Sequence, residues 1–90
     1  AVSASRIQGD GRVVAVQAKD IAVGDRIALA AGERAPVDGV VEEGMSDLDC
    51  SMLTGETLPQ AARIGVRVHA GVINLTQPLV MRATARAQDS

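Results

Sequence analysis

The chain has 90 residues with nine basic and eleven acidic side chains, which give a formal net charge of −2. A chain of this length forms one domain, whose core buries only roughly 60 to 65% of the surface of the unfolded chain. The charges are spread without a basic cluster that could follow a phosphate backbone, so we expect no nucleic acid partner.

Aliphatic side chains have to fill the core, because the chain contains no Phe, Trp or Tyr. Val is the commonest of the larger ones, and β-branched residues favour strands over helices. The single cysteine, Cys50, has no partner for an internal disulfide, and we expect a buried, inert thiol in a reducing compartment. The longest apolar stretches, such as residues 27–31, are far shorter than the ~20 residues that span a bilayer.

The first predicted element is a hairpin. Gly9, Asp10 and Gly11 lie between residues 6–8 and 12–16, and this composition is typical of a tight turn between two antiparallel strands. The sequence therefore predicts a two-stranded unit ahead of the rest of the domain.

Turns and short strands alternate in the next part of the chain. A Gly-Asp turn at residues 24–25 precedes an apolar strand at residues 26–30. Two closely spaced turns follow at residues 31–34 and 36–39, ahead of a strand at residues 40–42. We interpret the second of these as an Asx-type turn with a structural role, and we expect its last residue, Gly39, to have a positive φ.

The strand pattern stops after this point and returns near the end of the chain. Residues 45–52 predict an irregular or one-turn helical segment, whereas strand signals return at residues 66–69, 72–75 and 79–84. Short strands at such spacing predict a mainly all-β fold, a small distorted jelly-roll or β-sandwich with short irregular or one-turn helical segments.

A Thr-Gly-Glu tripeptide at residues 54–56 places a carboxylate beside a glycine on a predicted exposed loop, and Pro59 limits how far this loop rearranges. By itself such a tripeptide is more often a solvated turn. Its weight comes from further motifs that occur around it in one order and at one set of spacings. These are Gly-Asp at 24–25, Gly-Glu at 32–33, Pro-Val-Asp-Gly at 36–39, Glu-Gly at 43–44, Asp49, Ser-Met-Leu at 51–53 and Ala-Gly-Val-Ile-Asn at 70–74.

Together these motifs resemble the actuator domain of P-type ATPases. The resemblance runs from about Lys19 to Asp89, and residues 36–39 and 78–84 are closer to heavy-metal pumps than to sodium, potassium or calcium pumps. It implies that residues 1–90 are one actuator-type domain excised from a larger membrane pump, in which a hairpin over the first 18 residues precedes the family-like segment.

Several properties of the parent pump follow from this resemblance. The expected partners are the phosphorylation and nucleotide-binding domains and the transmembrane helices of the same chain, with the domain on the cytosolic face of the membrane and a monomer when isolated. The parent is expected to use ATP and Mg²⁺. This domain is expected to hold no cofactor or metal and to have no ATPase activity alone, because its sequence contains neither an Asp-Lys-Thr-Gly-Thr motif nor a Gly-rich nucleotide loop.

The resemblance also implies roles for the loop residues. Glu56 would be the catalytic carboxylate that assists hydrolysis of an aspartyl phosphate, since a fixed carboxylate both orients water in line and accepts its proton, an effect of roughly 10²- to 10⁴-fold. Gly55 is expected to let the backbone approach the phosphoryl oxygens without a Cβ clash, and the Thr54 hydroxyl to hold the loop by a hydrogen bond.

Four further residues are candidates for supporting roles. We expect Asp49, Thr57 and Pro59 to support the loop, Asp49 by accepting backbone N–H groups, and Glu33 to contact a partner domain. In an alternative interpretation, Asp49 and Glu33 are only exposed acidic residues in turns.

Some positions depart from the family pattern. Cys50 replaces a carboxylate, and with His69 it offers too few donors for a closed metal site. Thr57 replaces a serine and keeps its hydroxyl. The run at residues 74–79 leans toward copper pumps.

Two other classes of function remain open at this point. The chain could be a non-catalytic β module that binds a partner, in which the Gly-Asp and Pro-Val-Asp-Gly motifs are only turns. It could also be a small hydrolase that uses Glu56 with Asp49 or Asp38, although no spacing fixes a second catalytic group.

Overall fold

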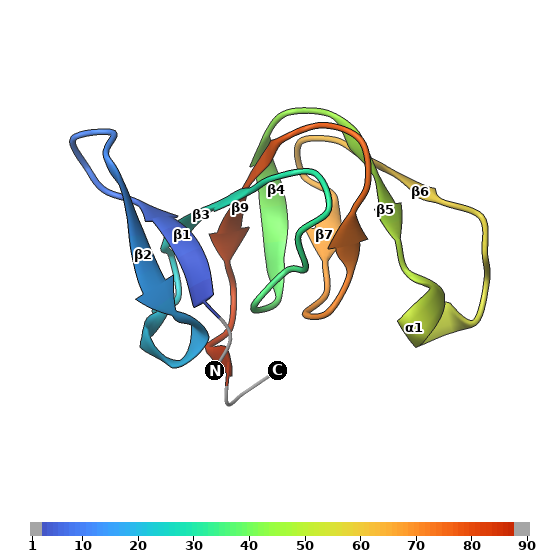
Figure 1. The fold of residues 1–90 in the computed structure, drawn as a ribbon, viewed down its shortest axis with the longest axis horizontal. Coiled ribbons are helices and arrows are strands. Elements are labelled where there is room, and N and C mark those ends of the chain that lie inside the picture. Colours follow the sequence, from blue (N-terminus) through green and yellow to red (C-terminus); the bar gives the residue numbers. More distant parts are fainter. Residues whose placement is uncertain (1–2, 88–90) are drawn as a thin grey trace.

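The structure, a computed structural model, describes residues 3–87 and consists of two antiparallel sheets with little helix (Figure 1). The larger sheet has six strands in the order β2-β1-β3-β9-β4-β7, and the smaller has three in the order β6-β5-β8. The predicted mainly all-β fold is confirmed.

The elements are β1 (Ser3–Ile7), β2 (Val13–Gln17), the 3-10 helix η1 (Ala18–Asp20), β3 (Arg26–Leu29), β4 (Gly39–Glu43), β5 (Ser46–Asp49), α1 (Ser51–Thr54), β6 (Gln60–Ala62), β7 (Arg67–Val68), β8 (Ile73–Asn74) and β9 (Leu79–Ala83).

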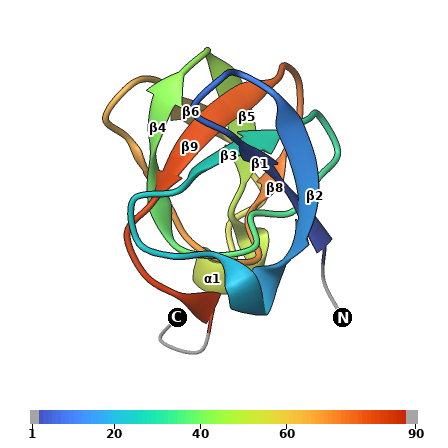
Figure 2. The same cartoon turned by 90° about the vertical axis from the view of Figure 1, so that its left-hand side faces the viewer.

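The predicted hairpin is formed by β1 and β2, which pair antiparallel over residues 3–7 and 13–17. The N–H of Gln8 donates to the carbonyl oxygen of Arg12 at 2.7 Å and closes the turn. β1 also pairs with β3, and Figure 2 shows these three strands next to one another. The hairpin is therefore the edge of the larger sheet and not a separate appendage.

Both sheets contribute to one aliphatic core. Val37 and Met81 are fully buried, and Leu48 of the smaller sheet is 2% exposed. At Gly39 in β4, an added Cβ would lie 2.4 Å from the carbonyl oxygen of Arg82 in β9. Gly39 is not among the glycines with positive φ, so that expectation is wrong. The glycine is needed because β4 and β9 approach each other too closely for a side chain.

The segment predicted to be irregular contains a strand as well as a helix. β5 pairs with β6 and β8, and α1 follows it directly. Ser46 and Leu48 point inward, whereas Asp47 and Asp49 are half-buried. The sequence pattern did not reveal this strand because only one of its two inward side chains is apolar.

A buried asparagine connects the two sheets. Asn74 has no exposed surface, and its side-chain amide donates to the carbonyl oxygens of Leu29 at 2.9 Å and Gln77 at 2.7 Å. Its side-chain oxygen accepts a hydrogen bond from the hydroxyl of Ser46. Satisfied buried polar groups of this kind specify one arrangement of a core. The role of Asn74 in this sequence run is therefore structural.

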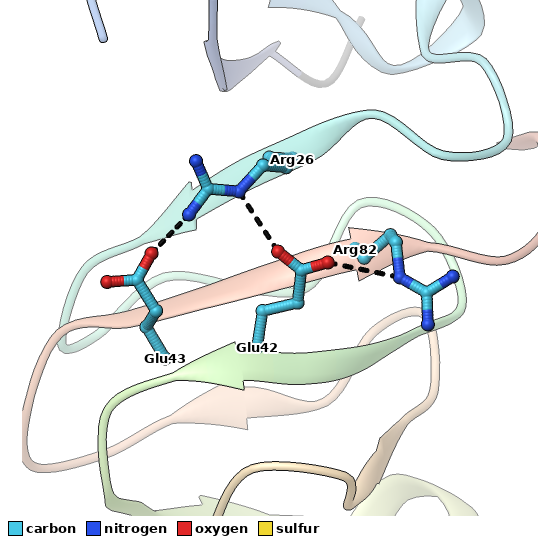
Figure 3. A network of polar contacts seen from close by, with 4 residues as sticks. All are labelled: Arg26, Glu42, Glu43 and Arg82. Atoms are coloured by element: carbon cyan, nitrogen blue, oxygen red, sulfur yellow. Dashed lines mark hydrogen bonds and ion pairs between the residues drawn. The ribbon is translucent and has the colours of Figure 1, made fainter. Parts of the chain in front are cut away.

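Four charged side chains form a network on the outer face of the larger sheet (Figure 3). Glu42 in β4 accepts from Nε of Arg26 at 3.0 Å and from Nε of Arg82 at 3.1 Å, and Arg26 also pairs with Glu43. Arg26 and Arg82 lie directly opposite each other on β3 and β9. Glu42 therefore offsets the repulsion between two like charges on neighbouring strands.

Candidate functional site

The Thr-Gly-Glu motif lies on a projecting segment at the end of the molecule opposite the β1–β2 hairpin (Figure 1). α1 follows β5, and the chain then runs to β6 without further regular structure. Every residue from 52 to 61 is exposed. The predicted exposed loop is therefore part of a ten-residue segment that the domain itself leaves uncovered.

Local hydrogen bonds determine the shape of this segment. The carbonyl oxygen of Cys50 accepts from the N–H of Leu53 at 2.9 Å and of Thr54 at 3.1 Å, and the N–H of Gly55 donates to Ser51 at 2.8 Å. Gly55 ends α1 in the left-handed region, with φ of 75°. An L side chain is strained in this conformation, so a glycine stops the helix here at low cost.

Thr54 and Glu56 are connected through the threonine hydroxyl. It donates to the carbonyl oxygen of Cys50 at 3.2 Å and accepts from the N–H of Glu56 at 3.2 Å. The backbone of Glu56 is thus tied to the first turn of α1, while its carboxylate stays exposed. The structure brings residues 54–56 together as one compact turn, in which a carboxylate faces solvent on a backbone held at two points.

Asp49 lies at the start of the same turn. Its Oδ1 accepts from the N–H of Ser51 at 2.9 Å. Hydrogen bonding by the Ser51 hydroxyl and backbone, helped by the positive charge of Arg34, lowers the pKa of the Asp49 carboxyl below its ordinary value. The acceptor of a backbone N–H at this helix start is therefore an ionised carboxylate.

The other candidate residues are less closely tied to the motif. Thr57 and Pro59 continue the exposed segment toward β6. Glu33 accepts from the N–H of Ala30 at 2.7 Å, so its carboxylate closes its own turn. Asp38 accepts from the N–H of Ala70 at 2.8 Å and holds a turn in the same way.

Cys50 and His69 lie on one depression of about 330 Å³ behind the loop, which Leu53, Thr54 and Gln60 also line. Burial, with the negative charge of Asp49 in addition, raises the pKa of the Cys50 thiol. Within residues 3–87, no three His, Cys, Asp or Glu side chains gather as a set that could hold a metal ion. Cys50 and His69 are therefore a neutral thiol and an exposed imidazole that line the same depression.

Sequence reasoning missed Arg34. Its Nη1 donates to Sδ of Met52 at 3.1 Å and to the carbonyl oxygen of Gly71 at 3.4 Å. The contact with α1 joins residues 18 positions apart in the chain, and no local pattern signals it.

Comparisons with known proteins agree with the resemblance found in the sequence. The family model for the P-type ATPase actuator domain matches residues 1–90. The nitrogen fixation protein FixI of Rhizobium leguminosarum bv. viciae is 50% identical over 82 residues, which are 91% of this chain and 10% of that protein. A copper-exporting P-type ATPase of Legionella pneumophila is 42% identical over 88 residues, 98% of this chain and 12% of that protein.

The fold is also found in a solved pump. The crystal structure of a zinc-transporting PIB-type ATPase in its E2.Pi state has a TM-score of 0.88 and 30% identity, over 93% of this chain and 14% of that one. This chain thus spans only about a tenth of the length of such relatives. The chain belongs to the P-type ATPase actuator domain family, and its relatives place it among the actuator domains of heavy-metal pumps.

Proposed function

We propose that this domain promotes hydrolysis of an aspartyl phosphate in the phosphorylation domain of the same pump and couples this step to conformational change during metal transport. The observation that carries the proposal is the turn at residues 54–56, which presents an exposed carboxylate on a backbone fixed through the Thr54 hydroxyl and the Gly55 cap. A preorganised carboxylate at the tip of a projecting segment suits a reaction partner on another domain.

Glu56 acts on the water molecule in this reaction. The carboxylate orients the water in line with the scissile bond and accepts one of its protons, while the water oxygen forms a bond to phosphorus. The bond between phosphorus and the aspartyl oxygen breaks, which leaves inorganic phosphate and a free aspartate. Thr54 and Gly55 keep the carboxylate in place for this step.

The surroundings of Glu56 support docking on a protein surface. Met52 is 73%, Leu53 54% and Leu58 76% exposed, so large apolar side chains flank the motif on both sides. Covering them offsets part of the repulsion between the carboxylate and the phosphoryl group. In the parent, a bound Mg²⁺ would offset more of this repulsion, and ATP would be the source of the phosphoryl group.

The same proposal places the domain in a membrane pump. None of the helices within residues 3–87 is long and apolar enough to cross a bilayer. The transmembrane helices, the phosphorylation domain and the nucleotide-binding domain would be other parts of the same chain, and this domain would lie on the cytosolic side, where the phosphorylated aspartate forms.

Copper is the cargo that we propose for the parent. The support is the relative named as a copper exporter, which matches 98% of this chain. Residues 74–79 add no support for copper. Their first residue, Asn74, is buried and hydrogen-bonded to the backbone, so the structure gives it a role in the fold. Stimulation of ATP hydrolysis by Cu⁺ in the purified parent tests the cargo, and stimulation by Zn²⁺ alone would contradict it.

The decisive experiment follows the phosphorylated parent pump. Wild type and Glu56→Gln are labelled briefly with radioactive ATP, and loss of label is measured after a chase at matched protein level. Glu56→Gln should form the phosphorylated intermediate and lose label roughly 10²-fold more slowly or worse. Asp20→Asn removes an exposed acid of η1 and serves as the control. Equal decay in all three would identify a non-catalytic β module.

A further inference from the structure

The helix that carries the motif has little intrinsic means of keeping its orientation. α1 has four residues and buries none of them. A helix of this length is not stable in isolation, because one turn fixes several dihedral angles for very few hydrogen bonds. Its orientation therefore depends on the contacts of its ends with the rest of the domain.

Arg34 makes such contacts from a well-fixed position. Its backbone forms an isolated bridge with Ile73, and the neighbouring Ala35 is 3% exposed and donates to Val72 at 2.8 Å. The side chain extends from this anchor to Met52 in α1. One nitrogen, Nη1, reaches both Sδ of Met52 and the carbonyl oxygen of Gly71.

The charge of Arg34 also has a small effect at the start of the helix, without an ion pair. The guanidinium charge also acts on Asp49, whose carboxylate accepts the N–H of Ser51. The direct contact of Arg34 with α1 is therefore the hydrogen bond to the sulfur of its second residue, Met52. Met52 is 73% exposed, so packing of its side chain does not provide the same restraint.

We propose that Arg34 is a positioning residue, which fixes the orientation of α1 on the domain and thereby the direction in which Glu56 is presented. The inference rests on the proposed function and deepens it. Arg34 acts only through the helix and touches none of the reacting atoms. Loss of the guanidinium would leave the turn at residues 54–56 intact but allow it to tilt, and small misplacements of a catalytic group slow a reaction considerably.

The test compares loss of label from the phosphorylated parent in several variants. Arg34→Met keeps an unbranched, largely apolar stem and removes the donors and the charge of the guanidinium. We expect normal formation of the intermediate and decay roughly three- to tenfold slower than in wild type. Arg34→Lys keeps the positive charge but lacks the planar guanidinium and its several N–H donors. It should decay faster than Arg34→Met and more slowly than wild type. Arg63→Met, a change of another exposed arginine, should decay like wild type.

A double variant separates positioning from a general loss of structure. If Arg34 acts only through Glu56, Arg34→Met should slow decay no further when Glu56→Gln is already present. Additive slowing, or decay of Arg34→Met at the wild-type rate while Glu56→Gln is slow, would overturn the inference and leave the proposed function standing. Fast decay of Glu56→Gln would overturn both.

A spectroscopic measurement on the 90-residue chain reports the orientation directly, because its described residues form a buried aliphatic core. In Arg34→Met, the methyl resonance of Met52 and the amide resonance of Gly55 should shift, whereas the methyl resonance of the buried Met81 should not. Unchanged Met52 and Gly55 signals would refute the positioning role. A shift of Met81 as well would show general loss of packing and would also refute it.

Discussion

Gly55 is the residue whose conformation determines how the motif is presented. Its φ of 75° costs an L residue about 1–2 kcal/mol, whereas an added Cβ would meet no atom within 4 Å. We therefore expect Gly55→Ala to redirect the turn rather than to unfold the domain, and to slow dephosphorylation of the parent with little change in its melting temperature. Gly11→Ala is the matched control, because Gly11 has φ of 89° and an equally open surrounding at the hairpin turn. Equal decay in both variants would contradict this prediction.

A second prediction at this scale concerns Asp49. Its folded-state pKa is lowered by hydrogen bonds with Ser51, so the contribution of this carboxylate is present above the unfolded pKa and is lost as pH falls through the folded one. The amide resonance of Ser51 should titrate with a midpoint below 3.8, the ordinary value. Asp49→Asn should abolish this titration. A midpoint at or above the ordinary value would show that the hydrogen bond does not persist in solution.

At the scale of elements, the network on the outer face connects three neighbouring strands. Glu42→Gln leaves Arg26 and Arg82 facing each other across β3 and β9. The side chains are partly exposed, so we expect a loss of only about 0.5–1 kcal/mol in the free energy of unfolding, smaller at high salt. Urea unfolding at two salt concentrations measures it. Glu43→Gln, which removes a partner of Arg26 alone, should cost less, and an equal cost would argue against a bridging role of Glu42.

The sequence predicted some strands of the domain and missed others. The β1–β2 hairpin was predicted from a local turn signal, and β1 and β2 do pair. β5 and β6 were not predicted, because Ser46, Asp47 and Asp49 give no apolar alternation and β6 contains only three residues. These strands exist because Leu48 and Ala62 are buried in the core, a condition that appears only when the chain is folded. Local pattern thus missed β5, whose inward positions include the polar Ser46, and β6, which is too short to show an alternation.

For the whole molecule, Asn74 is the residue that relates the two sheets. Asn74→Ala leaves the carbonyl oxygens of Leu29 and Gln77 and the hydroxyl of Ser46 without this partner in the interior. We expect a loss of roughly 2–3 kcal/mol in the free energy of unfolding, measured by urea unfolding of the 90-residue chain. Gln77→Ala keeps the backbone oxygen that accepts from Asn74 and should be close to neutral. A neutral Asn74→Ala would show that the amide does not hold the sheets together.

The sequence by itself determined the family and the candidate motif, because these depend on residue types at fixed spacings along the chain. Turn chemistry at residues 9–11 and an aliphatic composition were also sufficient to predict a mainly β domain. Only the tertiary structure decided that Gly39 is needed for close approach of strands, that Asn74 connects the sheets and that Arg34 contacts α1. Each of these depends on atoms that are distant in sequence, and folding alone brings them within contact distance.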